Sequence, residues 1–248
     1  GEKTWCTFAG RAELLMLLAR TGSAGDGARG LSMLLVDKPA TRDRSFRFTR
    51  EGGSMEGRAI STIGYRGMRS FVVSFDGWPV PDRQRIGEEG EGFALCMQGF
   101  SGGRLQTAAR AVGVMEAALR ATVRQVGLRE VFGRPLIDHP LAAARVREMA
   151  ARIQAGRQLA YRVADAMDDG SGDASVAAAA VKLLTCADAE WVTRQAMQLH
   201  GGMGYASESE VSRLWLDARV LNIFEGAEEV LALRVIARHL LRKVEGRA

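Results

Sequence analysis

The spacing of hydrophobic residues changes once along the chain, near residue 86. Before that point, short apolar runs stand between segments rich in glycine and aspartate. These runs cover residues 14–18, 31–36 and 71–75, and a turn-rich segment lies at 22–27. Short apolar runs bounded by turn residues predict strands. We therefore expect three strands and a loop, with the prolines after the third run ending the sheet region.

From about residue 91 the apolar residues recur every three or four positions, as Leu95, Met97, Phe100 and Leu105 do. This spacing places them on one face of a helix. It predicts a long helix from residue 93 to about 128. The same periodicity predicts further helices at 138–167, 173–199 and 228–241, and a short helix that opens near residue 207.

Polar residues mark where several of these helices begin. Asp138 is expected to be an N-cap, with Pro140 in the first turn, and Asp173 is expected to cap the next helix. Ser207 and Glu210 have the spacing of a capping box. A glycine-rich turn at 168–172 separates the second and third helices.

These elements predict an α+β protein with two parts. Residues 1–85 are expected to form a partial antiparallel β-barrel, and residues 86–248 an antiparallel four-helix bundle. The first residues, Gly1 to Trp5, have the pattern of the middle of a strand and contain no initiator methionine. We therefore expect a processed or truncated chain whose sheet is incomplete at its N-terminal edge.

Composition excludes several classes of protein. The chain has 248 residues, of which 47% are hydrophobic and 25% charged, as in ordinary globular proteins. No segment approaches the roughly 18 apolar residues of a membrane helix, so no membrane insertion is expected. The net charge is +5, but arginine alternates with acidic residues and no basic tail is present. This pattern favours a solvated, ion-paired surface over nucleic-acid binding.

The cysteines and histidines are few and dispersed. Cys6, Cys96 and Cys186 form no Cys-x-x-Cys pair, which argues against a disulfide framework and favours a reducing cytoplasm. The three histidines are too far apart in the sequence to indicate a metal centre, so no metal is expected.

Three short segments have residue types suited to chemistry. The glycine-rich segment 200–205 would let a backbone approach a phosphate, and Arg129 at a helix end could pair with a pyrophosphate. Glu225 lies in an apolar segment before Gly226, a setting suited to a general base. Each also has an ordinary structural interpretation when taken singly. Segment 200–205 would be a helix–helix turn, Arg129 would be part of a helix terminus with an ion pair, and Glu225 would be a helix-end glutamate.

Taken together and in order, the motifs resemble those of the acyl-CoA dehydrogenase family. The resemblance covers residues 2 to about 241. Its most distinctive part is the run Phe132-Gly133-Arg134-Pro135-Leu136 with Arg129 before it. The other matching segments are 1–7, 80–93, 104–113, 198–205 and 217–226. Three stretches, 64–68, 104–110 and 217–226, look most like those of methylsuccinyl-CoA dehydrogenases.

The resemblance implies an FAD-dependent dehydrogenation of an acyl-CoA thioester in fatty acid metabolism. Glu225 would remove the α-proton while the β-hydride goes to flavin N5, and the electrons would pass to an electron-transfer flavoprotein. Arg104 would face the CoA side of the substrate or support the base, and Gly226 would lie on the substrate side. The residues implied in FAD binding are Trp5 and Thr7, and Arg129, Phe132, Gln198 and Gly202 for the FAD of a neighbouring subunit. The last group implies a homo-oligomer, a dimer of dimers in this family.

Some relatives place the base on the first long helix, but Ser101-Gly102-Gly103 offers no carboxylate there, which favours Glu225. An oxidase of the same fold, or a catalytically silent flavin-binding partner subunit, are the alternative functions. From the resemblance we expect the family's N-terminal helical domain to be absent from this chain. The chain also has Ala227 where threonine is usual and Met68 where serine is usual.

Overall fold

The structure is a computed structural model that describes residues 1–170 and 173–246. Its internal contacts divide the chain into two compact units, Gly1–Gly99 and Phe100–Ala248. The division falls inside the first long helix, α1 (Gly92–Leu128), whereas the hydrophobic pattern changes near residue 86. Each unit is described by itself.

The first unit contains two antiparallel sheets. One has four strands in the order β1-β6-β5-β4 and the other has three in the order β2-β3-β7. In the described residues these sheets do not close into a barrel, so the expected barrel is present as two separate sheets. The strands are β1 (Glu2–Thr7), β2 (Leu14–Arg20), β3 (Leu31–Asp37), β4 (Ser45–Arg50), β5 (Gly53–Ala59), β6 (Ser70–Asp76) and β7 (Arg85–Ile86).

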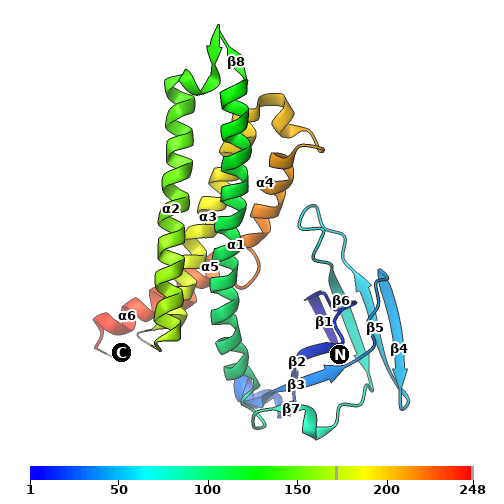
Figure 1. Ribbon diagram of the computed structural model, residues 1–248. Coiled ribbons are helices and arrows are strands. Elements are labelled where there is room, and N and C mark those ends of the chain that lie inside the picture. The colour runs from blue at the N-terminus through cyan, green and yellow to red at the C-terminus, as the bar shows by residue number, and fades with distance from the viewer. Residues whose placement is uncertain (171–172, 247–248) are drawn as a thin grey trace. The chain divides into compact units, whose positions relative to one another are not determined.

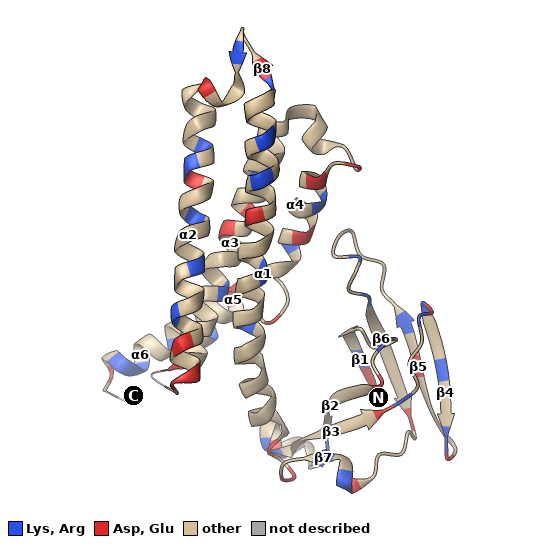
Figure 2. Ribbon diagram, in the orientation of Figure 1, with Lys and Arg blue, Asp and Glu red and all other residues tan. Residues whose placement is uncertain are grey.

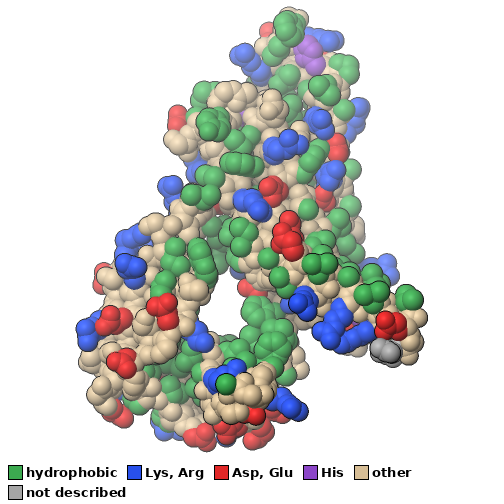
Figure 3. Space-filling model, turned by 180° about the vertical axis from the view of Figure 1, so that it is seen from behind, with side chains coloured by type: hydrophobic (Ala, Val, Ile, Leu, Met, Phe, Trp, Pro, Cys, Tyr) green, Lys and Arg blue, Asp and Glu red, His purple; other side chains and the backbone are tan. Residues whose placement is uncertain are grey.

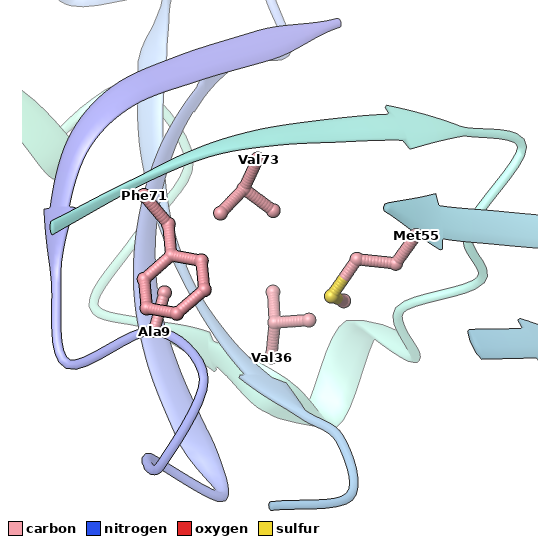
Figure 4. Packing of buried hydrophobic residues seen from close by; sticks show 5 residues of the cluster. All are labelled: Ala9, Val36, Met55, Phe71 and Val73. Carbon is pink, nitrogen blue, oxygen red and sulfur yellow. The ribbon is translucent and has the colours of Figure 1, made fainter. Parts of the chain in front are cut away.

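Residues from both sheets form the core of this unit (Figure 4). Val36 of β3 packs with Met55 of β5 and with Phe71 and Val73 of β6, and Ala9 completes the cluster. Each of these side chains is almost completely buried. Phe71 and Val73 point to the same side because side chains two apart in a strand share a face.

The three predicted strands are present, but β4 and β5 were not expected. In β4 only alternate residues, such as Phe46 and Phe48, are partly buried. The strand therefore has no continuous apolar run, and its period of two is the only signal. In the segment 22–27, expected to be a loop, residues 24–27 begin a 3-10 helix, Ala24–Gly30, of which Ser23 is the N-cap. β7 follows the prolines that were expected to end the sheet region, after a short 3-10 turn, Asp82–Gln84.

The second unit is helical (Figure 1). α1 is followed by α2 (Pro140–Asp168), α3 (Ala174–His200) and α4 (Glu210–Leu221), and the first three helices share a core of small side chains. Their shared core contains Ala108, Ala160, Val163, Ala178 and Val181. The predicted four-helix arrangement is confirmed in type and order.

Short elements connect these helices and end the chain. A hairpin of β8 (Glu130–Val131) and β9 (Arg134–Pro135), with the 3-10 turn Leu136–Asp138, links α1 to α2. The 3-10 turn Gly201–Tyr205 links α3 to α4. The final helix expected at 228–241 is instead α5 (Glu228–Val230), a π-helical stretch (Leu231–Ala237) and α6 (Arg238–Val244).

One of the three predicted helix starts is confirmed. Asp173 caps α3, because its side chain accepts a hydrogen bond from the backbone N–H of Val176 at 3.2 Å. Asp138 closes the preceding 3-10 turn, so His139 is the N-cap of α2 and Pro140 its first residue. The expected capping box is absent, since α4 begins at Glu210 with Ser209 as its N-cap. In the expected turn at 168–172, residues 171 and 172 lie outside the described residues.

Basic and acidic residues are interspersed along the helices (Figure 2). Arg152 of α2 donates a hydrogen bond of 2.5 Å to Asp188 of α3, and Arg157 of α2 pairs with Glu116 of α1. Within the described ranges, no helix is both long and apolar enough to cross a bilayer. Those same residues contain no group of three or more metal-ligating side chains.

Candidate active site

Glu225 lies in the turn that follows α4. Its φ angle is 56°, in the left-handed region that glycine tolerates and a glutamate rarely adopts. The next residue, Gly226, has a φ of 101°, and a Cβ atom there would lie 2.9 Å from the Leu231 side chain. The chain therefore reverses at two successive left-handed residues, and this reversal turns Glu225 toward α1.

The carboxylate of Glu225 lies directly against Gly103 of α1. A Cβ atom on Gly103 would lie 2.6 Å from Oε2 of Glu225, closer than real Cβ contacts come. Because glycine has no side chain, helix α1 leaves room for the carboxylate at this position only as long as residue 103 is glycine.

Two buried cations act on the same carboxylate. Arg104 of α1 is only 8% exposed, and Lys182 of α3 is fully buried. Burial lowers the pKa of each, and the charge of Glu225 opposes that effect in both. In the described part of the chain the buried Nε of Arg104 has no hydrogen-bond partner. An unpaired buried donor beside a carboxylate is suited to an absent polar ligand.

A second site of interest is an open cleft of about 1070 Å³ at the end of the bundle near the β8–β9 hairpin. Four residues expected to contact FAD line it together: Arg129, Phe132, Gln198 and Gly202. They come from the end of α1, the hairpin, the end of α3 and the following turn. Figure 3 shows hydrophobic, basic and histidine side chains gathered at this end of the unit.

The charged residues that line the cleft are all basic. Besides Arg129, its lining includes Arg145, Arg194, His139 and His200, and no acidic residue is among the lining residues. A cleft with arginines and glycine backbone but no carboxylate is suited to an anionic group such as a pyrophosphate.

Phe132 stands at the tip of the hairpin and is 94% exposed, with a φ of 52°. His139 contacts both the backbone and the aromatic ring of this hairpin. Its Nε2 forms a hydrogen bond of 2.9 Å with the carbonyl oxygen of Val131, and its ring meets Phe132 edge-on. An exposed phenylalanine held in this way is available for contact with a ligand or another chain.

The remaining two predicted residues belong to the first unit. Trp5 of β1 is 62% exposed and has a φ of 59°, at a place where the pairing of β1 with β6 shifts register. Thr7 ends β1, and its hydroxyl lies 3.3 Å from that of Ser70. The backbone is thus in the left-handed region at Trp5, Phe132 and Glu225. This conformation is energetically costly for residues other than glycine and occurs often at functional sites.

Sequence reasoning missed Lys182 and the basic side chains of the cleft other than Arg129. Lys182 lies in an alanine-rich part of α3 and is flanked by Val181 and Leu183. A single charge inside an apolar helical run was the signal that could have identified it, because lysine is almost never fully buried without a partner.

Comparison with known proteins gives these sites a context. The profile of the family described as "Acyl-CoA dehydrogenase, C-terminal domain" matches residues 90–241, more than half of the chain. The chain belongs to the acyl-CoA dehydrogenase family. The predicted resemblance is therefore confirmed, and members of this family are FAD-dependent flavoproteins.

Individual relatives of the acyl-CoA dehydrogenase family match nearly the whole chain. It is 43% identical to (2S)-methylsuccinyl-CoA dehydrogenase of Cereibacter sphaeroides over 97% of the chain and 43% of that protein. The solved butyryl-CoA dehydrogenase of Megasphaera elsdenii is 31% identical with a TM-score of 0.89, over 98% of this chain and 60% of that one. The chain thus spans less than two thirds of these relatives.

A further solved chain is described as the electron transferring flavoprotein of Acidaminococcus fermentans. It is 30% identical with a TM-score of 0.87, over 98% of this chain and 60% of that one.

The donors present fit part of an FAD molecule. The cleft offers a charge-bearing Arg129, the backbone of a glycine-rich turn, and an exposed aromatic ring, which suit a pyrophosphate and its nucleoside. Trp5 offers an exposed indole for a flavin ring and Thr7 a hydroxyl beside it.

Proposed function

We propose that this chain is the part of an acyl-CoA dehydrogenase that supplies the catalytic base and one side of an FAD site. Glu225 carries the proposal, because its carboxylate is partly buried, clamped against Gly103 and flanked by Arg104. FAD supplies the acceptor for a hydride from the β-carbon of the substrate. The substrate is a CoA thioester.

Glu225 is the base that takes the proton from the carbon next to the thioester carbonyl. A carboxylate removes such a weakly acidic proton only when the developing negative charge on the thioester oxygen is stabilised. In the described residues the backbone N–H of Glu225 has no protein acceptor, so it is free to donate to that oxygen. Because the chain reverses at Glu225 and Gly226, we propose that the carboxylate and the backbone N–H of Glu225 both serve the substrate side.

Arg104 and Gly226 form the rest of the proposed substrate side. The guanidinium of Arg104 favours the charged form of the base beside it, and its unpaired Nε can donate to a polar group of the substrate. Gly226 allows the left-handed turn that a side chain would block through Leu231.

The FAD contacts are proposed to come from two subunits. Trp5 would pack on the flavin ring and Thr7 would hydrogen-bond near it, whereas Arg129, Phe132, Gln198 and Gly202 would bind the FAD of a neighbour. The cleft that the last four line supports the second group. Each FAD site then needs two copies of the chain, which closed symmetric assembly provides, here as a dimer of dimers.

The substrate and the electron acceptor follow from the relatives. Identity of 43% with a (2S)-methylsuccinyl-CoA dehydrogenase supports a short branched acyl-CoA, and methylsuccinyl-CoA is the first one to test. A solved structure of the same fold has a description that names an electron transferring flavoprotein, and this association supports an acceptor of that kind. We place the reaction in the cytoplasm.

The function is tested by mixing the FAD-loaded natural protein, in its full length, with methylsuccinyl-CoA or butyryl-CoA without oxygen. We expect loss of the flavin absorbance near 450 nm and a product ~2 Da lighter than the substrate. Oxygen-dependent turnover without any flavoprotein acceptor would favour the oxidase. No bleaching with any acyl-CoA, despite bound FAD, would favour the silent partner subunit.

Gly103→Ala should slow turnover while stabilising the protein. The added methyl displaces the Glu225 carboxylate, and a misplacement of ~1 Å costs up to about 10²-fold in rate. Alanine in a helix interior is favoured over glycine by about 1 kcal/mol. Gly113→Ala on the same helix meets nothing within 4 Å and should raise stability alone. Equal turnover of the two variants, by steady-state assay and thermal unfolding, would contradict the contact.

A further inference from the structure

Lys182 is a buried cation bonded to backbone rather than to an acid. Its side chain is fully buried in α3, and its Nζ donates hydrogen bonds to the carbonyl oxygens of Asn222, at 3.3 Å, and Gly226, at 2.7 Å. In the described ranges no carboxylate lies within ion-pairing distance of it. A buried charge is costly unless its donors are satisfied, so these two carbonyls hold the ammonium in place.

The two carbonyls belong to residues on either side of Glu225. Asn222 follows the last residue of α4, and Gly226 follows Glu225. We propose that Lys182 is a positioning residue that clamps the turn 222–226 and thereby fixes the Glu225 carboxylate against Gly103. This inference rests on the proposed function, since it concerns how the proposed base is held.

The strain in the turn explains why such a clamp is needed. Glu225 and Gly226 are both left-handed, and a glutamate leaves this conformation unless its surroundings hold it. Asn222 provides a second anchor, because its side-chain N–H donates to Glu190 at 2.8 Å and its carbonyl also accepts from Glu228 N–H. The turn is thus tied to α3 at its start and to Lys182 at both ends.

A simpler interpretation is that Lys182 only caps the C-terminus of α4, where cations and carbonyls commonly meet. The bond to Asn222 fits that role. The bond to Gly226 does not, because Gly226 lies beyond the helix end and on the far side of Glu225, and this bond is the shorter of the two. The geometry therefore favours a clamp across Glu225 over a helix cap.

The charges around Lys182 are consistent with this role. Burial lowers the pKa of its ammonium, while Cys186, Glu228 and Glu225 raise it and Arg104 lowers it further. The groups that favour the charged form include the proposed base, so the ammonium and the Glu225 carboxylate attract each other.

Lys182→Met tests the clamp in the FAD-loaded, full-length protein, because methionine keeps much of the apolar length and removes the donor. We expect kcat for acyl-CoA to fall ~10²-fold with KM within about threefold, as for a misplaced base. Amide hydrogen exchange of residues 222–228 should accelerate, while exchange in the middle of α1, α2 and α3 stays as in the parent protein. Lys182→Gln, which keeps a shorter donor, should recover part of both.

Thr185→Val is the matched control, because Thr185 is equally buried one turn away on α3 and bonds only within its own helix. It should leave kcat and the exchange of the turn unchanged. Parent-like kcat in Lys182→Met, or faster exchange throughout the bundle with no excess in the turn, would overturn the clamp. If Lys182→Met does not fold, a Lys182→Gln variant with reduced kcat and faster exchange confined to residues 222–228 would support the clamp. Parent-like kcat and exchange in that variant, or faster exchange throughout the bundle, would overturn it. Turnover retained by Glu225→Gln would instead overturn the proposed base itself.

Discussion

Glu225→Gln should abolish removal of the α-proton while FAD and acyl-CoA still bind. Glutamine has nearly the same shape as glutamate but no basic oxygen, so the turn and its contact with Gly103 are kept. Losing a general base costs about 10²–10⁴-fold in rate. The measurement is stopped-flow bleaching of the flavin by acyl-CoA, together with exchange of the substrate α-proton for deuterium from solvent.

A matched change four residues further along the chain provides the control for Glu225→Gln. Glu229→Gln removes an exposed carboxylate from the start of α5 and should leave the rate unchanged. Near-parent proton exchange in Glu225→Gln would show that another group is the base, whatever the fate of the hydride step.

Arg129→Ala should weaken FAD binding by about 10-fold to 10²-fold. A pyrophosphate then loses a charge-assisted hydrogen bond worth about 1.5–3 kcal/mol. The measurement is FAD occupancy by absorbance, followed by sedimentation with detection at a flavin wavelength. Because a charged contact is screened by salt, the difference from the parent protein should shrink as salt rises.

Arg124→Ala is the control for Arg129→Ala. Arg124 lies on α1 near the same end, is exposed, and pairs with Glu210 rather than lining the cleft. Its replacement should leave FAD occupancy as it is. Equal occupancy in the two variants would remove Arg129 from the FAD site, and a dilute monomer that retains one FAD per chain would contradict the shared site.

The long helices could be predicted because their periodicity is strong. The predicted start and end of α1, residues 93 and 128, agree with the observed Gly92–Leu128 to within one residue. Local exceptions to periodicity were not predictable in the same way. The π-helical stretch Leu231–Ala237 has the apolar spacing of an α-helix but a different hydrogen-bond pattern. In β4 only alternate residues are partly buried, so the strand contains no continuous apolar run.

The sequence predicted residues of the candidate site, but it did not predict their backbone conformations or their contacts. No sequence signal marks the left-handed backbone of Trp5, Phe132 or Glu225, because none of them is glycine or asparagine. Lys182 lies 40 residues before Asn222 along the chain, so only the packing of α3 against α4 brings the two together. Contacts at that separation follow from tertiary structure alone.

The clamp on the turn acts through main-chain oxygens, and this frees the side chains between them to vary. Ile223 is 56% exposed, and exchanging it leaves the hydrogen bonds of Lys182 to residues 222 and 226 in place. A library randomised at position 223 should therefore vary an exposed side chain two residues from the proposed base without moving the carboxylate. In such a scaffold, the side chains of the turn and the position of the base can evolve independently.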